Sequence, residues 1–192
     1  MKSLYIQLIL KCRAMKNLYL LLIVLSVTKP VAAQYTAVDQ GSAVQFTIGN
    51  FGFDVTGSFT GVRGQIDFNP QDPAAAGFDV SIDAATVNTD NSLRDRHLKD
   101  DGYFDVKNYP LIRLASTKII AASKGGTYIF NGQLTIKNIS KSISFPFTAV
   151  PSDDGFVFKG SFRINRKDFG VGGTSTISNE LVVSLNVIAK RR

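Results

Sequence analysis

Apolar and polar residues alternate with a period of two along almost the whole chain after residue 40. In the first such row, Val44, Phe46 and Ile48 are separated by polar residues. Alternation of this kind places every second side chain on one face of a β-strand. Further rows occupy residues 51–59, 66–68, 78–84, 128–136, 143–147, 156–164 and 181–187, and residues 111–120 are apolar on both faces. The pattern therefore predicts eight or nine strands.

Short segments of turn-forming residues separate these rows. They include Gly61–Gly64, Asn69-Pro70, Gly125-Gly126 and Asp153–Gly155, and their residue types favour tight turns. Such links are too short to contain the helices that parallel βαβ crossovers require. We therefore expect an all-β fold, an antiparallel sandwich or barrel.

Residues 86–110 are the long interruption of this alternation. The segment fits a short helix that Thr89 or Asp90 caps at its start. Leu93 and His97 would then lie one turn apart on one face of the helix. We interpret the segment as a helical crossover between two halves of a barrel.

Most of the 14 phenylalanines lie in the same alternating rows as aliphatic residues, so these rows are expected to form the inner face. An eight-stranded barrel is either filled by side chains or holds one small ligand. Two interpretations therefore stay open, a packed aromatic core and an apolar tunnel. Glycine within a strand favours the tunnel because it leaves space for a ligand near the backbone. The glycines in question are Gly57, Gly61, Gly64, Gly132 and Gly160.

Residues 1–33 have the features of a secretory signal peptide. A basic start precedes the apolar run 18–27, which at about ten residues is too short to span a bilayer. Val31-Ala32-Ala33 then supplies the small residues that precede a cleavage site. We expect cleavage near Ala33 and a periplasmic or secreted mature protein, residues 34–192, without a membrane anchor. An uncleaved anchor is the alternative.

Removal of this leader changes the charge balance and the cysteine content. The formal charge of the chain is +7, but residues 1–33 hold five basic residues and no acidic one, which leaves only +2. A chain without a basic stripe is not expected to bind nucleic acid. The single cysteine, Cys12, also lies in the leader, so no disulfide is expected after cleavage. The start codon is Met1 or Met15.

Candidates for catalysis or metal binding are few. His97 is the only histidine, and residues two apart on a helix, such as Asp95 and His97, do not face each other as a catalytic triad requires. Asp100, Asp101 and Asp105 do not have the spacing of an EF-hand loop. We predict no catalytic and no metal site, with a hydrolase that uses His97 as a rival hypothesis.

Two polar clusters flank the apolar rows. The first comprises Arg94, Arg96, His97 and Lys99, and the second is Asn165–Asp168. Each is either a solvated surface or a polar collar at the mouth of a barrel, where arginine would hold a phosphate or carboxylate head group.

An ordered set of motifs runs through residues 38–189. It consists of Asp39-x-x-Ser42-x-Val44-x-Phe46, Gly57-Ser58-Phe59, Arg94-Asp95-x-His97-Leu98, Tyr103-Phe104-Asp105-Val106, Tyr109-Pro110, Ser116-Thr117, Gly132-x-Leu134-Thr135-Ile136 and Ile164-Asn165-Arg166-x-Asp168-Phe169-Gly170-Val171. The set resembles the central and late signatures of the YceI-like lipid/polyisoprenoid-binding family.

The resemblance implies a lipocalin-like, extended antiparallel eight-stranded β-barrel with a short helical crossover and an apolar tunnel. Members are typically exported, bind a long-chain lipid such as an isoprenoid or isoprenoid quinone, and have no established catalytic residues. Together with the rows and clusters above, it gives the candidate ligand-binding residues Arg94, His97, Leu98, Phe104, Phe130, Phe145, Phe158, Phe162, Asn165, Arg166, Asp168 and Phe169.

Four positions depart from the family pattern, and two of them are Asn138 and Ser142, where relatives usually have Gly and Pro around the later hairpin. Many relatives have a histidine where this chain has Gly41, and a second one where it has Asn50. Their absence argues against a histidine cluster that grips a head group, and it leaves the identity of the lipid open.

We therefore expect an exported, non-catalytic protein that holds an isoprenoid, an isoprenoid quinone or a fatty-acid derivative for transport, storage or sequestration. No cofactor other than this lipid is expected, and a homodimer is compatible with the role. The alternative is a structural or stress-related envelope protein whose barrel is filled by its own side chains.

Overall fold

The computed structural model describes residues 33–173 and 176–192. Residues 1–32 of the expected signal peptide, which include Met1, Met15 and Cys12, lie outside the described residues. The first described strand begins at Ala33, so the expected cleavage site falls at the start of that strand.

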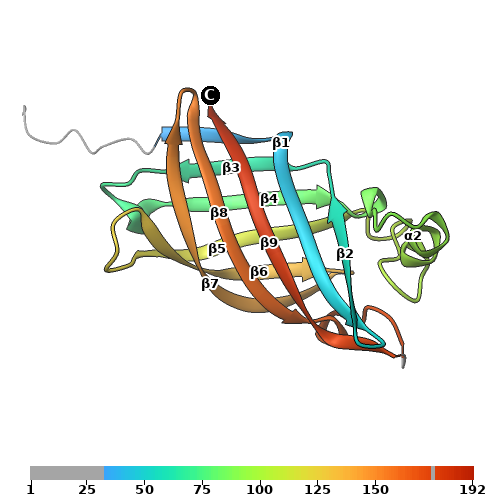
Figure 1. Cartoon of the computed structure of the whole chain (residues 1–192). Coiled ribbons are helices and arrows are strands. Elements are labelled where there is room, and N and C mark those ends of the chain that lie inside the picture. The colour runs from blue at the N-terminus through green and yellow to red at the C-terminus, as the bar shows by residue number, and fades with distance from the viewer. Residues whose placement is uncertain (1–32, 174–175) are drawn as a thin grey trace, which may run out of the picture. The chain divides into compact units, whose positions relative to one another are not determined.

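Nine antiparallel strands and a few short helices make up the described chain (Figure 1). The strands are β1 (Ala33–Asn50), β2 (Phe53–Phe59), β3 (Arg63–Phe68), β4 (Gly77–Asp83), β5 (Leu111–Ala121), β6 (Thr127–Ile136), β7 (Ile139–Ser152), β8 (Gly155–Asn165) and β9 (Ile177–Arg191). The helices are η1 (Pro73–Ala75), η2 (Ala84–Thr86), α2 (Ser92–Lys99) and η3 (Arg166–Phe169). Among the described residues, no helix has the length and apolar character needed to cross a bilayer.

The long strand β1 closes the sheet into a barrel because it pairs along both of its edges. One edge pairs with β9, from Tyr35 to Asn50. The other edge pairs with β3 over Ala33–Ala37 and with β2 over Val44–Asn50. Since each strand from β3 to β9 also pairs with the next, β1 and β3–β9 form a ring of eight, and β2 extends alongside the second half of β1. The predicted eight-stranded antiparallel barrel is confirmed.

A β-bulge divides β1 into two halves, of which the first pairs with β3 and the second with β2, while both pair with β9. The register against β9 shifts between Val38 and Ala43, where Gly41 has a φ of +80°. Ser42 stabilises the bulge, because its Oγ donates to the Val38 carbonyl at 2.5 Å and accepts from the Ile188 amide at 2.9 Å. The motif Asp39-x-x-Ser42 thus lies at the bulge of β1, the strand that closes the barrel, and its Ser42 stabilises that bulge.

The expected helix is present, but its start differs from the prediction. Asn91, rather than Thr89 or Asp90, caps α2, because the Asn91 side chain accepts a hydrogen bond from the Arg94 amide at 3.0 Å. Leu93 is 69% exposed, so the face it was expected to share with His97 points to solvent. The helix lies between β4 and β5 in the chain and caps one end of the barrel (Figure 1). We call this the helix end.

The half of the barrel away from α2 is filled by aromatic side chains. Phe68 is fully buried, and its ring contacts those of Phe78, Tyr128, Phe156 and Phe158 edge to face, at centroid distances of 5.1–6.2 Å. Such T-shaped pairs match the positive ring edge to the negative ring face. We call this group the aromatic plug. It comprises Tyr35, Phe68, Phe78, Tyr128, Phe130, Phe145, Phe147, Phe156 and Phe158.

Two inward-facing glycines make room for the plug rather than for a ligand. A Cβ at Gly132 would lie 2.2 Å from the Ala115 carbonyl oxygen and 2.6 Å from the ring of Phe130, and one at Gly160 would lie 3.0 Å from the ring of Phe145. Both rings therefore occupy the space that a side chain would take. The expectation that these glycines leave room for a ligand is wrong at these two positions.

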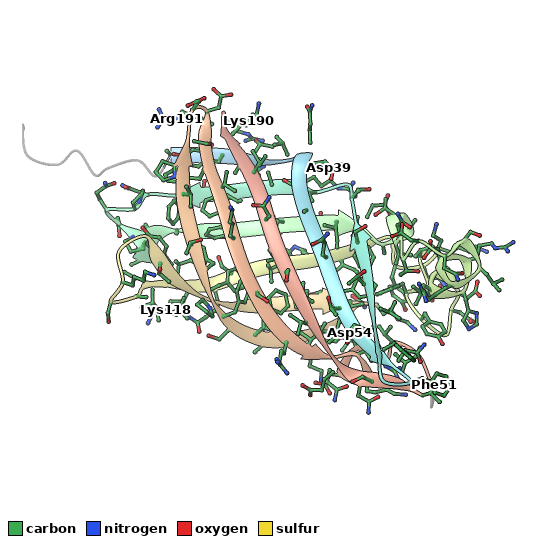
Figure 2. All side chains as sticks on the ribbon, in the orientation of Figure 1. Asp39, Phe51, Asp54, Lys118, Lys190 and Arg191 are labelled. Atoms are coloured by element: carbon green, nitrogen blue, oxygen red, sulfur yellow. The ribbon has the colours of Figure 1, made fainter. Side chains whose placement is uncertain are left out.

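Two phenylalanines that were expected on the inner face lie outside it. Phe51 is 74% and Phe53 is 76% exposed. Phe51 lies in the tight turn between β1 and β2, where it has a φ of +51° and Gly52 a φ of +82°, and Phe53 is the first residue of β2. Figure 2 shows Phe51 at the tip of this hairpin. The alternating row continues past the point where the barrel ends, so these two rings have no inner surface to contact.

Replacement of Phe68 by alanine is expected to destabilise the protein by about 3–5 kcal/mol, because it removes a fully buried ring from the centre of the plug. Phe53→Ala is the matched control, since the same change at an exposed ring is expected to alter the free energy of unfolding by no more than about 0.5 kcal/mol. Urea denaturation measures both. Equal losses for the two variants would contradict this description of the core.

Asp79 on β4 and Arg113 on β5 form a bidentate ion pair on the outer face, with both N–O distances 2.6 Å. The hydrogen bonds from Arg113 hold the pKa of Asp79 below its ordinary value. The pair therefore contributes stability above the ordinary aspartate pKa near 3.9 and loses it as the pH falls below that value.

Asp79→Asn is expected to lower the free energy of unfolding by at most about 1 kcal/mol at pH 7, because both side chains are more than half exposed and water screens the pair. The difference between the two proteins should shrink as the pH falls below about 4. Denaturation curves between pH 7 and pH 3 test this, and a difference that does not change with pH would exclude the ion pair as its cause.

Candidate functional site

The helix-end half of the barrel encloses an apolar cavity of about 180 Å³. Aliphatic side chains from almost every strand line it. The largest contribution comes from β9, with Leu181, Val183, Leu185 and Val187. The facing walls include Val80 and Ile82 of β4, Ile112 and Leu114 of β5, and Leu134 and Ile136 of β6.

The size and chemistry of this cavity suit an apolar guest. It is slightly larger than an engineered apolar cavity of about 150 Å³ that stays dry and admits a benzene ring. A cavity holds ordered water only where two to four polar partners surround the site. The aliphatic walls of β9 provide none, so burying a hydrocarbon chain is the favoured way to fill it.

The helix α2 and the residues after it cover the cavity at the helix end. Leu98 and Phe104 line the cavity, and the ring of Phe104 packs edge to face against Phe59 of β2 at 5.4 Å. Two contacts fasten this cover to the neighbouring turns. The Gly172 amide donates to the Gly102 carbonyl at 2.8 Å, and the Lys137 Nζ donates to the Asp101 carbonyl at 2.8 Å. We call residues 91–106 the lid.

A hydrogen-bond network around Thr89 anchors the lid to the barrel. Thr89 is buried, and its Oγ1 donates to Asp95 Oδ1 at 2.6 Å while its amide donates to the same oxygen at 2.9 Å. Arg94 donates from Nε to Thr89 Oγ1 and from Nη2 to the Thr89 carbonyl, both at 2.7 Å. Thr89 thus bridges the guanidinium and the carboxylate at the edge of the cavity.

Arg166 at the start of η3 holds the opposite rim of the cavity. Its side chain is buried, with a residue exposure of 6%. Nε donates to the Ser178 carbonyl at 2.9 Å, Nη1 to the Val171 carbonyl at 2.8 Å and Nη2 to the Ile177 carbonyl at 3.2 Å. A fork of donors fixed in one plane can satisfy several carbonyls at once. Arg166 therefore ties Val171, just after η3, to Ile177 and Ser178 at the start of β9.

The structure brings five of the twelve predicted ligand-binding residues to the cavity. They are Arg94, Leu98, Phe104, Phe162 and Arg166. Two of these are the arginines that anchor the lid and the rim, and three supply apolar surface. These two arginines of the proposed polar collar lie at the cavity, but much of their hydrogen bonding is directed at the protein itself.

Three predicted phenylalanines, Phe130, Phe145 and Phe158, belong to the aromatic plug and do not line the cavity. The two interpretations of the phenylalanine rows therefore apply to different parts of the barrel. The aromatic side chains fill one half, and the open space in the other half is bounded mainly by valine, leucine and isoleucine.

The remaining predicted residues lie around the cavity rather than in its wall. The His97 side chain is exposed, with Nδ1 3.3 Å from Asp100 Oδ2. Asn165 caps η3 by accepting from the Lys167 amide at 2.9 Å, and Asp168 is exposed. Phe169 is fully buried behind the cavity wall. Within residues 33–173 and 176–192, no three His, Cys, Asp or Glu side chains converge as a metal site requires.

Sequence reasoning did not single out the aliphatic side chains of β9 as candidate site residues. Their alternation at residues 181–187 was visible and correctly predicted an inward-facing row. The pattern did not show how deep in the barrel each residue lies. Only the register against β1 and β8 places Leu181 and Val183 beside the cavity.

A comparison with protein-family models matches residues 35–189 to the YceI-like domain. The chain belongs to the YceI-like family. A UPF0312 protein of Yersinia enterocolitica is 27% identical over 167 residues, which cover 81% of this chain and 86% of the relative.

Solved structures of the family share the barrel. BcnA of Burkholderia cenocepacia superposes with a TM-score of 0.74 at 24% identity, over 79% of this chain and 98% of BcnA. A domain from Saccharophagus degradans, described as polyisoprenoid-binding, superposes with a TM-score of 0.66 at 14% identity, over 84% of this chain and 99% of that domain. At these identities the likeness establishes the fold.

Replacement of Thr89 by valine is expected to loosen the lid, because it removes the hydroxyl that bridges Arg94 and Asp95. The loss should be about 1–3 kcal/mol, the cost of leaving buried polar groups without a partner. Thr89→Ser keeps the hydroxyl and is the matched control. Hydrogen exchange of the α2 amides measures the effect, and equal exchange rates in the two variants would show that the bridge does not hold the lid.

Proposed function

We propose that this protein binds one long-chain apolar ligand in the cavity under the lid, without carrying out a chemical reaction on it. The observation that carries the proposal is the aliphatic cavity itself, which lies within the closed barrel and beneath α2. Each buried methylene contributes about 0.8 kcal/mol. A hydrocarbon tail therefore supplies affinity without any polar contact.

Relatives support an isoprenoid or an isoprenoid quinone as the ligand. The family match covers most of the chain, and the Saccharophagus degradans domain with this fold is described as polyisoprenoid-binding. A fatty-acid derivative fits the same cavity, because aliphatic walls recognise the apolar character of a chain and not its branching.

Several polar groups near the cavity have structural partners, which supports binding over catalysis. Asp95 and Arg94 both bind Thr89. The exposed His97 lies beside Asp100 and not beside Asp95. A hydrolase would need the histidine and a nucleophile to converge over the ligand, and the exposed His97 does not line the cavity.

Export remains part of the proposal. The apolar run at residues 18–27 and the small residues before Gln34 support a periplasmic or secreted protein. There it would hold its ligand for transport, storage or sequestration, because a long apolar chain does not dissolve freely in water.

One observation favours the alternative of a filled envelope barrel, namely the aromatic plug in the half away from the lid. The helix-end half differs because it retains a cavity. The two functions are therefore distinguished by whether that cavity contains a lipid in the cell.

The experiment is mass spectrometry of organic extracts from the full-length protein, purified without detergent from the native envelope. We expect about one long-chain lipid per protein. Val183→Trp, which fills the cavity from β9, should reduce the retained lipid roughly tenfold or more by removing buried contact area. Ser184→Trp is the matched control, because it introduces the same ring at the next, exposed position.

Lipid retained by wild type and Ser184→Trp but lost from folded Val183→Trp would support the proposal. Protein that is reproducibly empty and that also fails to take up isoprenoids or fatty acids would overturn it in favour of the filled barrel.

A further inference from the structure

We propose that a row of four phenylalanine rings across the barrel acts as a chain-length ruler, which sets how much of a ligand's hydrocarbon tail the protein can bury. This inference rests on the proposed function, and it specifies that the cavity selects ligands by the length of their hydrocarbon tail. We call the row Phe78, Phe130, Phe145 and Phe162 the aromatic floor.

The four rings form a continuous series of contacts from β8 to β4. Phe162 stacks on Phe145 with centroids 4.6 Å apart and an interplanar angle of 29°. Phe145 stacks on Phe130 at 4.9 Å and 22°. The ring of Phe130 then meets that of Phe78 edge to face at 6.1 Å. The series thus spans β8, β7, β6 and β4.

The cavity ends where this series begins. Phe162 lines the cavity, whereas its stacking partner Phe145 does not. On the other walls the cavity reaches Val80 and Val187. The next inward residue on β4 is Phe78, and the residue that pairs with Val187 on β8 is Phe158, and both belong to the plug.

The floor is braced from behind and cannot easily give way to a longer chain. Phe78 also contacts Phe147 at 5.5 Å and Phe158 at 5.2 Å. The ring of Phe145 occupies the space above Gly160. A closely packed aromatic group resists insertion, because extra methylenes would force side chains out of their preferred rotamers.

A tail that enters at the lid would therefore gain affinity only until it reaches the aromatic floor and the plug residues beyond Val80 and Val187. The polar end of such a ligand stays at the helix end, because the deep part of the cavity offers only apolar surface. A longer chain leaves the surplus outside the lid. The ligand class is thus a single-chain amphiphile, and its affinity depends on the length of the tail segment that the cavity buries.

The experiment measures the Kd with which the full-length protein binds each of a series of straight-chain primary alcohols from C6 to C16. At about 0.8 kcal/mol per methylene, the Kd of wild type should fall about fourfold for each added carbon and then stop falling at a break length. Phe162→Ala should move the break to longer chains. Leu185→Phe, which adds a ring at the deep end of the cavity, should move it to shorter chains.

Phe156→Ala is the matched control, because it removes a ring from the plug at a position that does not line the cavity. Its break length should equal that of wild type. If Phe162→Ala does not fold, Leu185→Phe still decides the matter, since it fills space instead of removing a core ring.

The outcomes separate the ruler from the proposed function. If no alcohol binds at any length, the proposed function itself fails. If the alcohols bind but the Kd keeps falling through C16, or if the break is the same in wild type, Phe162→Ala and Leu185→Phe, binding stands and the ruler is overturned.

Discussion

The pairing of both edges of β1 is the constraint on which the rest of this structure depends. One edge joins β9, and the other is shared between β3 and β2. Closure pairs both edges of every strand in the ring of β1 and β3–β9 and sets the barrel at eight strands, a size that side chains can just fill. The bulge at Gly41 and Ser42 makes this double role possible, because it lets β1 change direction without losing its partner β9.

Given that enclosed volume, the residue types along the axis decide what occupies it. Aromatic rings and the inward-facing Gly132 and Gly160 fill the half away from α2. The helix-end half uses valine, leucine and isoleucine, and it is left with a cavity. The difference is geometric, since flat rings stack across the barrel while branched aliphatic side chains remain close to their own strands.

The strands, the crossover helix and the inner rows could be predicted from the sequence, because period-two alternation distinguishes the inner face from the outer face. The depth of each side chain along the barrel axis could not be predicted from the sequence. Phe53 and Phe158 lie in equally regular rows, yet the first is exposed beyond the barrel end and the second is buried in the plug. Depth depends on the register between strands that are far apart in the sequence, and alternation contains no information about it.

The same distinction explains why the signature residues predicted the place of the site better than its lining. Arg94 and Arg166 lie at the mouth of the cavity, but their hydrogen bonds hold the lid to Thr89 and the rim to the carbonyls of Val171 and Ser178. In this chain the two arginines therefore hold the mouth of the cavity together. The choice of ligand then falls to the aliphatic walls and to the floor beneath them, where a change of one side chain alters the volume without disturbing the hydrogen bonds that close the barrel.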